Sequence, residues 1–186
     1  MASRIYTRKG DGGETGFYGD RRGPKDCVRI EAYGTLDELN ACLGHAAALS
    51  PVKEFSALIF DIQRLLLELG SCLADPGKKS KLSKGLEDRD VVRLEEEIDR
   101  LNAELPPLEH FIVPAGLSPV TALQVARAVC RRAERRCVTL KREEPETPAI
   151  SIRFINRLAD LLFVLARATH HRAGGRDIEW RPRAGG

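Results

Sequence analysis

Apolar residues recur every three or four positions along most of this chain, with charged residues in between. This spacing is typical of amphipathic helices, because an α-helix completes one turn in about 3.6 residues. It predicts helices over residues 27–49, 52–73, 88–104, 118–140 and 149–173. Alternating apolar and polar runs are missing, apart from a short piece near residues 178–180. We therefore expect an all-α fold, a five-helix antiparallel bundle with an irregular glycine-rich N-terminal loop.

Proline and glycine mark several of the predicted helix ends. Pro106 and Pro107 end the third helix, and Gly174 ends the fifth. Ser118 is the expected N-cap of the fourth helix, with Pro119 as its first helical residue. The apolar positions of the third helix are Val91, Val92, Leu94, Ile98 and Leu101. The expected core stripe of the fourth helix is Ala122, Val125, Ala126, Val129, Ala133, Cys137 and Leu140.

The N-terminal segment departs most from the helical pattern. Six glycines lie between residues 10 and 23, and six cations but only three anions lie between residues 4 and 25. Glycine permits positive φ angles and close backbone approach. Clustered amides, hydroxyls and positive charges suit a polyphosphate ligand, although neither common phosphate-binding motif is present. A basic N-terminus without fixed structure would have the same composition.

The length of 186 residues indicates a single domain. We divide it into a loop at 1–26, a helical bundle at 27–173 and a tail at 174–186, and expect a polar loop over residues 75–85 inside the bundle. The net charge of +3 does not demand a nucleic-acid partner, because acidic and basic residues alternate along the helices.

The cysteines and the apolar segments indicate a cytoplasmic protein. The five cysteines include no C-x-x-C pair, so neither a disulfide framework nor a zinc site is indicated. No apolar run is long enough to span a bilayer, and the N-terminus lacks the apolar region of a secretory signal. We expect no membrane partner.

The fourth predicted helix carries a charged stripe beside its apolar one. Arg127, Arg131 and Glu134 follow one another at spacings of four and three residues, and Arg135 lies next to Glu134. Two arginines four residues apart repel each other by a few tenths of a kcal/mol. An anion or a partner carboxylate between them would offset this repulsion, and a solvated basic face is the alternative.

Polar residues also interrupt the first and fifth helices. Tyr33, Asp37, Asn40 and Gly44 share one stripe, which indicates either a polar contact across a helix interface or a surface pair. Asn156 lies in the middle of the fifth helix, where its amide competes with the backbone. We therefore expect the side chain of Asn156 to have a hydrogen-bonding role.

The histidines point to no metal site or catalytic triad. The adjacent rings of His170 and His171 diverge by about 100° on a helix, so they are expected to be surface residues at the helix end. No H-E-x-x-H pattern, nucleophile elbow or kinase signature is present.

Three separated segments carry a family resemblance. They are Thr7-x-x-Gly10-Asp11-x-Gly13-x-Thr15 with Arg22 and Lys25, leading to YGTLDELN at 33–40; FIVP at 111–114, leading to ARAVCRRAER at 126–135; and FINRLADLLF at 154–163. Together, and in this order, they resemble the ATP:cob(I)alamin adenosyltransferases of the five-helix-bundle, trimeric class. The resemblance covers residues 4–173.

The resemblance implies a reaction and a set of ATP contacts. The cobalt of cob(I)alamin would attack C5′ of ATP, giving adenosylcobalamin and triphosphate, with Mg²⁺ accompanying the phosphates. ATP would bind between adjacent subunits of a homotrimer. By matching position, the ATP-binding residues would be Thr7, Arg8, Lys9, Gly10, Thr15, Gly16, Lys25, Arg131, Glu134, Arg135 and Asn156.

Other roles follow from the same resemblance. Arg131, Asp37 and Arg127 would be the catalytic set, with Asp37 pairing across the subunit interface with Arg127. Phe111 would occupy the lower face of the corrin, whereas an apolar residue on a loop is otherwise usually a lid over the core. A corrinoid reductase and an adenosylcobalamin-dependent enzyme are the protein partners that this chemistry implies. The chain departs from the family pattern at Gln124, Ala115 and Lys9.

This chemistry agrees with the side chains that the sequence offers. A metal-centred nucleophile brings its own reactivity, so the protein has to orient the substrates and stabilise the leaving triphosphate, without a general base. A non-catalytic nucleotide- or corrinoid-binding bundle would use the same residues for regulation or delivery. A helical nucleic-acid binder is a further alternative, although the aromatic stacking platforms expected of one are missing.

Overall fold

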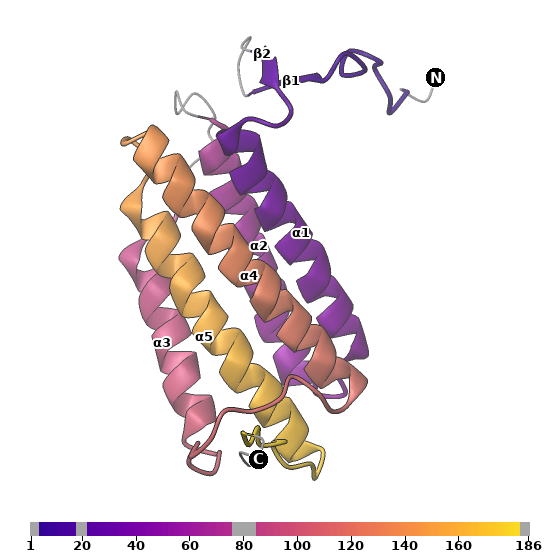
Figure 1. Cartoon of the computed structure of the whole chain (residues 1–186), viewed down its shortest axis with the longest axis vertical. Helices are drawn as coiled ribbons and strands as arrows, with labels where there is room; N and C mark the ends of the chain where they lie inside the picture. Colours follow the sequence, from indigo (N-terminus) through magenta and orange to yellow (C-terminus); the bar gives the residue numbers. More distant parts are fainter. Residues whose placement is uncertain (1–3, 18–21, 76–84, 183–186) are drawn as a thin grey trace.

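The computed structural model describes residues 4–17, 22–75 and 85–182, and this part of the chain forms five helices (Figure 1). The helices are α1 (Val28–Leu49), α2 (Lys53–Ala74), α3 (Asp88–Asn102), α4 (Ser118–Glu143) and α5 (Ala149–Arg172). Each predicted helix is confirmed, with ends that differ by at most three residues. The predicted loop over 75–85 lies almost entirely outside the described residues, as do residues 18–21 of the N-terminal loop.

Helix α4 lies between α1 and α5, with α2 against α1 and α3 against α5 (Figure 1). The neighbouring helices α3 and α5 run in the same direction. Arg153, near the start of α5, pairs with Asp88 at the start of α3, and Arg172, at the end of α5, donates to Glu104 just beyond the end of α3 at 2.9 Å. The other neighbouring pairs are antiparallel, and two of them, α1–α2 and α4–α5, are joined by short connections.

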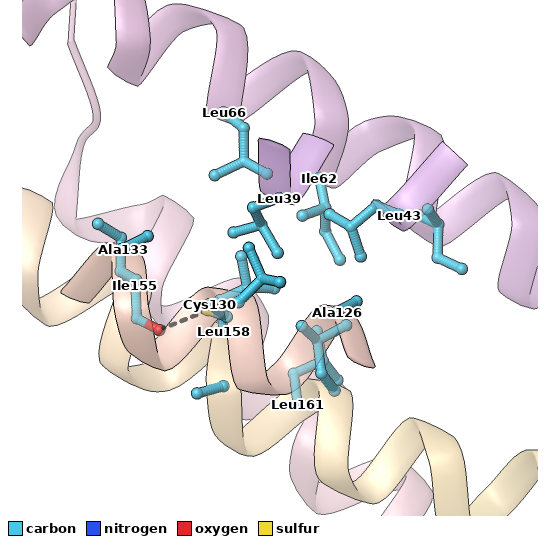
Figure 2. Close-up of a cluster of buried hydrophobic side chains, with 14 of the residues drawn as sticks. Leu39, Leu43, Ile62, Leu66, Ala126, Cys130, Ala133, Ile155, Leu158 and Leu161 are labelled. Atoms are coloured by element: carbon cyan, nitrogen blue, oxygen red, sulfur yellow. Dashed lines mark hydrogen bonds between the residues drawn. The ribbon is translucent and has the colours of Figure 1, made fainter. Parts of the chain in front are cut away.

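The core is a continuous apolar cluster between the helices (Figure 2). Its centre contains Leu39 and Leu43 of α1, Ile62 and Leu66 of α2, Ala126, Cys130 and Ala133 of α4, and Ile155, Leu158 and Leu161 of α5. The thiol of Cys130 donates to the carbonyl oxygen of Ile155 at 3.3 Å. Burial raises the pKa of the Cys130 and Cys137 thiols, so both remain protonated packing residues.

One predicted core position, Val125 of α4, is wrong. Val92 of α3 and Val125 of α4 are both exposed, whereas their neighbours Val91 and Ala126 are buried. Consecutive residues on a helix point about 100° apart, so an apolar residue beside the buried stripe can still face outward. Val125 lies instead in an apolar groove between α1 and α4.

The predicted irregular N-terminal loop includes one short hairpin, which the sequence did not predict. Strand β1 (Glu14–Gly16) pairs antiparallel with β2 (Arg22–Pro24), so that Thr15 lies opposite Gly23. Gly23 is buried under the ring of Phe17, where a Cβ atom would lie 2.6 Å from the ring. Close packing of this ring on the backbone therefore requires glycine at position 23.

Proline marks the start of α4, and glycine marks the end of α5. The N-cap of α4 is Leu117, so the prediction that Ser118 is the N-cap is wrong by one residue, and Pro119 lies within the first turn, where proline is tolerated. Helix α5 ends as predicted, with Gly174 at φ +77°. His170 is not a free surface residue, because its ring packs against Gly175.

A buried arginine fixes the end of the bundle from which the N-terminal segment leaves. Arg29, in the first turn of α1, donates to the carbonyl oxygen of Leu73 in α2 and pairs with Glu144, which follows α4. Three helices are therefore joined at the point where the chain enters the bundle.

The two adjacent valines of α3 give a matched test of the packing. Val91 is 5% exposed and Val92 is 48% exposed. Val91→Ala is expected to lower the free energy of unfolding by about 1–3 kcal/mol, through lost burial and a residual cavity. Val92→Ala should change it by less than about 0.5 kcal/mol. Urea unfolding measures both, and equal losses in the two variants would contradict this orientation of α3.

Candidate functional site

The polar face of α4 carries the first group of predicted site residues. Arg131 and Arg135 are exposed, and a guanidinium nitrogen of Arg135 donates to the carbonyl oxygen of Arg131 at 3.0 Å. Asn156 of α5 donates from Nδ2 to Oε1 of Glu134 at 2.9 Å, which confirms the expected hydrogen-bonding role of Asn156. The structure thus brings two guanidinium groups and an amide–carboxylate pair to one surface, a donor set suited to an anionic ligand.

Arg127 lies one turn before Arg131 on α4 and is half-buried. Its Nε donates to Oε1 of Gln124 at 2.8 Å, and its guanidinium carbon lies 5.9 Å from the centre of the Phe163 ring. Burial lowers the pKa of Arg127, and the positive charge of Arg131 lowers it further. The repulsion expected between the two arginines is therefore present. A carboxylate placed next to Arg127 would favour its charged form.

Gln124 is a residue of this site that sequence reasoning missed. It was noted as a departure from the family pattern, but the structure makes it the buried hydrogen-bond partner of Arg127. The available signal was the three-residue spacing between Gln124 and Arg127, which places both side chains on one face of a helix.

Asp37 lies on the exposed side of α1, in a groove between α1 and α2. The groove is lined by Tyr33, Gly34, Leu36, Asp37, Asn40, Leu66, Leu67, Gly70, Ser71 and Ala74. The predicted polar contact across a helix interface is confirmed for Asn40. Its Nδ2 donates to the main-chain carbonyl oxygen of Gln63 at 3.4 Å, and Nε2 of Gln63 donates to the main-chain carbonyl oxygen of Asn40 at 2.9 Å. Within the described part of one chain, Asp37 makes no hydrogen bond or salt bridge and is not paired with Arg127.

The predicted ligands of the N-terminal loop surround a tight turn. Gly13 has φ +83° and donates to the carbonyl oxygen of Gly10 at 3.2 Å. The ammonium group of Lys25 lies against Gly10, where an added Cβ atom would be 3.2 Å from Nζ. Arg8 has φ +59°, an uncommon conformation for a residue with a side chain. The remaining predicted ligands in this loop are exposed or half-buried. They are Thr7, Lys9, Thr15 and Gly16.

The loop extends away from the end of the bundle (Figure 1). Arg22 donates to the carbonyl oxygen of Lys9 at 2.6 Å and forms a salt bridge with Glu14 at 3.6 Å. Within the described ranges, no hydrogen bond or salt bridge connects residues 4–17 to a helix. One chain therefore presents the loop and the polar face of α4 as separate surfaces.

Phe111 lies at the opposite end of the bundle, on the segment that connects α3 to α4 (Figure 1). Its side chain is 81% exposed, so it is not a lid over the core. Its ring meets the ring of Trp180 edge to face, with the centres 6.5 Å apart. The two rings line a cleft together with Leu108, Glu109, His110 and Pro182. Sequence reasoning did not connect Trp180 to this site, although it identified the strand-like piece that contains Trp180.

Two further properties concern metals and membranes. In the described ranges, no group of three or more histidine, cysteine, aspartate or glutamate side chains could hold a metal ion. The five cysteines are free thiols. None of the described helices combines the length and the apolar character needed to cross a bilayer.

Comparison with known proteins identifies relatives over almost the whole chain. Residues 5–169 match the family model described as cobalamin adenosyltransferase. A corrinoid adenosyltransferase from Bacillus subtilis is 39% identical over 181 residues, which cover 95% of this chain and 92% of that protein. A human corrinoid adenosyltransferase is 39% identical over 180 residues, covering 94% of this chain and 72% of the human protein.

A solved structure supports the same relationship. A variant of the PduO-type ATP:corrinoid adenosyltransferase from Lactobacillus reuteri, complexed with cobalamin and ATP, superimposes with a TM-score of 0.91 at 36% identity. The match covers 96% of this chain and 100% of that chain. The five-helix fold and the sequence of this chain therefore both match those of these relatives. The chain belongs to the cobalamin adenosyltransferase family.

Proposed function

We propose that the chain transfers the 5′-deoxyadenosyl group of ATP to the cobalt of cob(I)alamin, giving adenosylcobalamin and inorganic triphosphate. The observation that carries the proposal is the hydrogen bond from Asn156 to Glu134 beside the exposed Arg131, in a chain whose relatives are named for this activity. An electron pair of cobalt forms the bond to C5′. The bond from C5′ to the triphosphate oxygen breaks, and its electron pair leaves with the triphosphate.

The residues of the loop and of the polar face of α4 would bind ATP and stabilise this leaving group. Charge grows on the triphosphate as the bond breaks, so preorganised cations lower the barrier. Arg131 is our candidate for the main contact to that charge, with Arg135 beside it. The contacts assigned to the loop are those of Thr7, Arg8, Lys9, Gly10, Thr15, Gly16 and Lys25. The hydrogen bond between Asn156 and Glu134 would hold both side chains in place for the nucleotide.

We place the ATP site between subunits of a homotrimer. The separation of the loop from the polar face of α4 within one chain supports this arrangement, because the loop of one subunit could then cover α4 of its neighbour. Asp37 would pair with Arg127 of the adjacent subunit, where the half-buried guanidinium would gain a carboxylate.

We assign the cleft beside Phe111 to the corrinoid. An exposed aromatic ring at the lower face of the corrin would keep a lower axial ligand away from cobalt. Loss of that ligand removes electron density from cobalt(II) and makes its reduction to cobalt(I) easier, since axial ligation sets metal potentials.

The remaining components come with the substrates or with other proteins. Mg²⁺ typically binds phosphate oxygens, waters and one or two carboxylates, so we expect it to arrive with the triphosphate of ATP. A corrinoid reductase would supply electrons, and an adenosylcobalamin-dependent enzyme would use the product. The five free thiols support a site of action in the reducing cytoplasm.

Arg131→Ala is expected to lose most of its turnover while the protein stays folded. A lost charge-assisted contact costs about 1.5–3 kcal/mol, so kcat/KM for ATP should fall roughly 10- to 150-fold. The spectrum of the Co–C product measures the rate. Arg136→Ala is the control, because Arg136 lies on the same helix in a salt bridge with Glu31 at 3.3 Å. Wild-type kcat/KM for ATP in Arg131→Ala would refute the assignment.

The Asp37–Arg127 pair can be tested by exchanging its charges. Asp37→Arg and Arg127→Asp should each weaken the trimer, by about 3–5 kcal/mol if the pair is buried in the interface. The double variant should recover much of this loss, because the opposite charges meet again. Light scattering reports the number of subunits. A wild-type monomer with full activity would refute the shared site, and failure of the double variant to recover would refute this pair.

Phe111→Ala is expected to impair the reduction of cob(II)alamin more than the transfer of the adenosyl group to cob(I)alamin. Turnover that starts from cob(II)alamin should fall far more than turnover from chemically pre-reduced cob(I)alamin, and the affinity for ATP should change little. Val113→Ala, on the same segment, is the control. The assignment fails if Phe111→Ala, saturated with ATP, still converts bound cob(II)alamin to the four-coordinate spectrum as completely as wild type.

A further inference from the structure

The C-terminal tail folds back onto the segment that carries Phe111. After α5 the chain reverses at Gly174 and runs antiparallel to residues 111–113. The amide of Trp180 donates to the carbonyl oxygen of Phe111 at 2.6 Å, and the amide of Val113 donates to the carbonyl oxygen of Ile178 at 2.7 Å. These contacts place the ring of Trp180 against the ring of Phe111.

This pairing is too short to hold itself in place. Even a complete two-stranded hairpin is at best marginally stable in water, and the tail up to residue 182 contributes a single β-bridge, between Ile112 and Glu179. A slip of one residue would turn Trp180 to the other face, away from Phe111. The register therefore needs a contact outside the pairing.

A buried arginine supplies that contact. The side chain of Arg167 in α5 is only 3% exposed, and its Nε donates to Oδ2 of Asp177 in the tail at 2.7 Å. Its Nη2 donates to the carbonyl oxygen of Pro106 at 2.8 Å. One guanidinium thus joins α5, the tail and the connecting segment between α3 and α4. All three line a pocket of about 340 Å³.

The turn that leads into the tail is also closely packed, against the ring of His170. The ring of His170 lies so near Gly175 that an added Cβ atom would be 2.1 Å from Cδ2. The same ring lies under Gly116, which has φ +122° and would place a Cβ atom 3.2 Å from Cε1. The connecting segment is therefore held by Arg167 before Phe111 and by His170 after it.

We propose that Arg167 and Asp177 are positioning residues for the corrinoid: their ion pair fixes the register of the tail and thereby the orientation of Phe111. This inference rests on the proposed role of Phe111 in corrinoid binding. Because Phe111 is highly exposed, the bundle core cannot orient its ring. Without the ion pair, the ring would have to be ordered when the corrinoid binds, which costs affinity.

The single tryptophan of the chain makes the tail directly observable. In Asp177→Asn we expect the emission of Trp180 to shift to longer wavelength and its quenching by acrylamide to increase, as the tail leaves Phe111. The KM for the corrinoid should rise about tenfold, in keeping with the loss of one hydrogen bond between charged groups, while the KM for ATP stays unchanged. Arg181→Gln is the matched control, since it removes an exposed salt bridge with Glu179 from the same tail.

A double variant tests whether the effect acts through Phe111. In a Phe111→Ala background, Asp177→Asn should not raise the KM for the corrinoid any further, because coupled residues are not additive. Asp177→Glu keeps the charge and should lie between wild type and Asp177→Asn. If Asp177→Asn does not fold, Asp177→Glu carries the test, with a smaller shift in the same readouts.

Three results would overturn the proposal. They are unchanged Trp180 emission in Asp177→Asn, an altered emission with an unchanged KM for the corrinoid, and an equal rise of both KM values. Absence of adenosyl transfer by the wild-type chain would instead refute the proposed function. The positioning of the tail by Arg167 and Asp177 would then be judged by the emission and quenching of Trp180, which require no substrate.

Discussion

The polar residues that α4 contributes to the candidate site owe their direction to the burial of the opposite side of that helix. The small residues Ala126, Cys130 and Ala133 pack between α1 and α5, and this apolar area fixes the rotation of the helix. Since consecutive residues point about 100° apart, Arg131 and Glu134 then have to lie at the edge of the buried stripe or outside it. The contact from Asn156 follows from the same packing, because α5 runs beside that edge.

The ends of the bundle are held differently from its middle. Arg29 at one end and Arg167 at the other are buried, and each binds one carboxylate and one backbone carbonyl oxygen from separate segments. Helical packing cannot position chain segments that lack a repeating apolar face. At both ends a guanidinium group positions these segments in place of helical packing. The planar guanidinium can donate to two acceptors in fixed directions. These are the ends where the N-terminal loop and the Phe111 segment leave the helices.

The sequence was sufficient for the helices and for part of the site. Periodicity located all five helices, and the cost of an amide in the middle of a helix predicted a hydrogen-bonding role for Asn156. The exposure of Val92 and the pairing of Arg167 with Asp177 depend on which elements become neighbours, which local spacing does not contain. The hairpin was missed for a similar reason, since Gly23 is explained only by the ring of Phe17 above it. Individual roles in binding came from the family resemblance and remain proposals.

The dimensions of α4 bear on how one ATP molecule could meet both groups of predicted ligands. Arg131 lies 12 residues before the end of α4 at Glu143, or about 18 Å along the axis, on the side of the bundle. The N-terminal loop joins α1 at this same end of the bundle. In its described parts, the loop extends away from the helices (Figure 1). A nucleotide bound by the loop of one chain is thus far from Arg131 of the same chain. In the proposed shared site, a neighbouring subunit whose α4 lies beneath the loop would bring the two groups together.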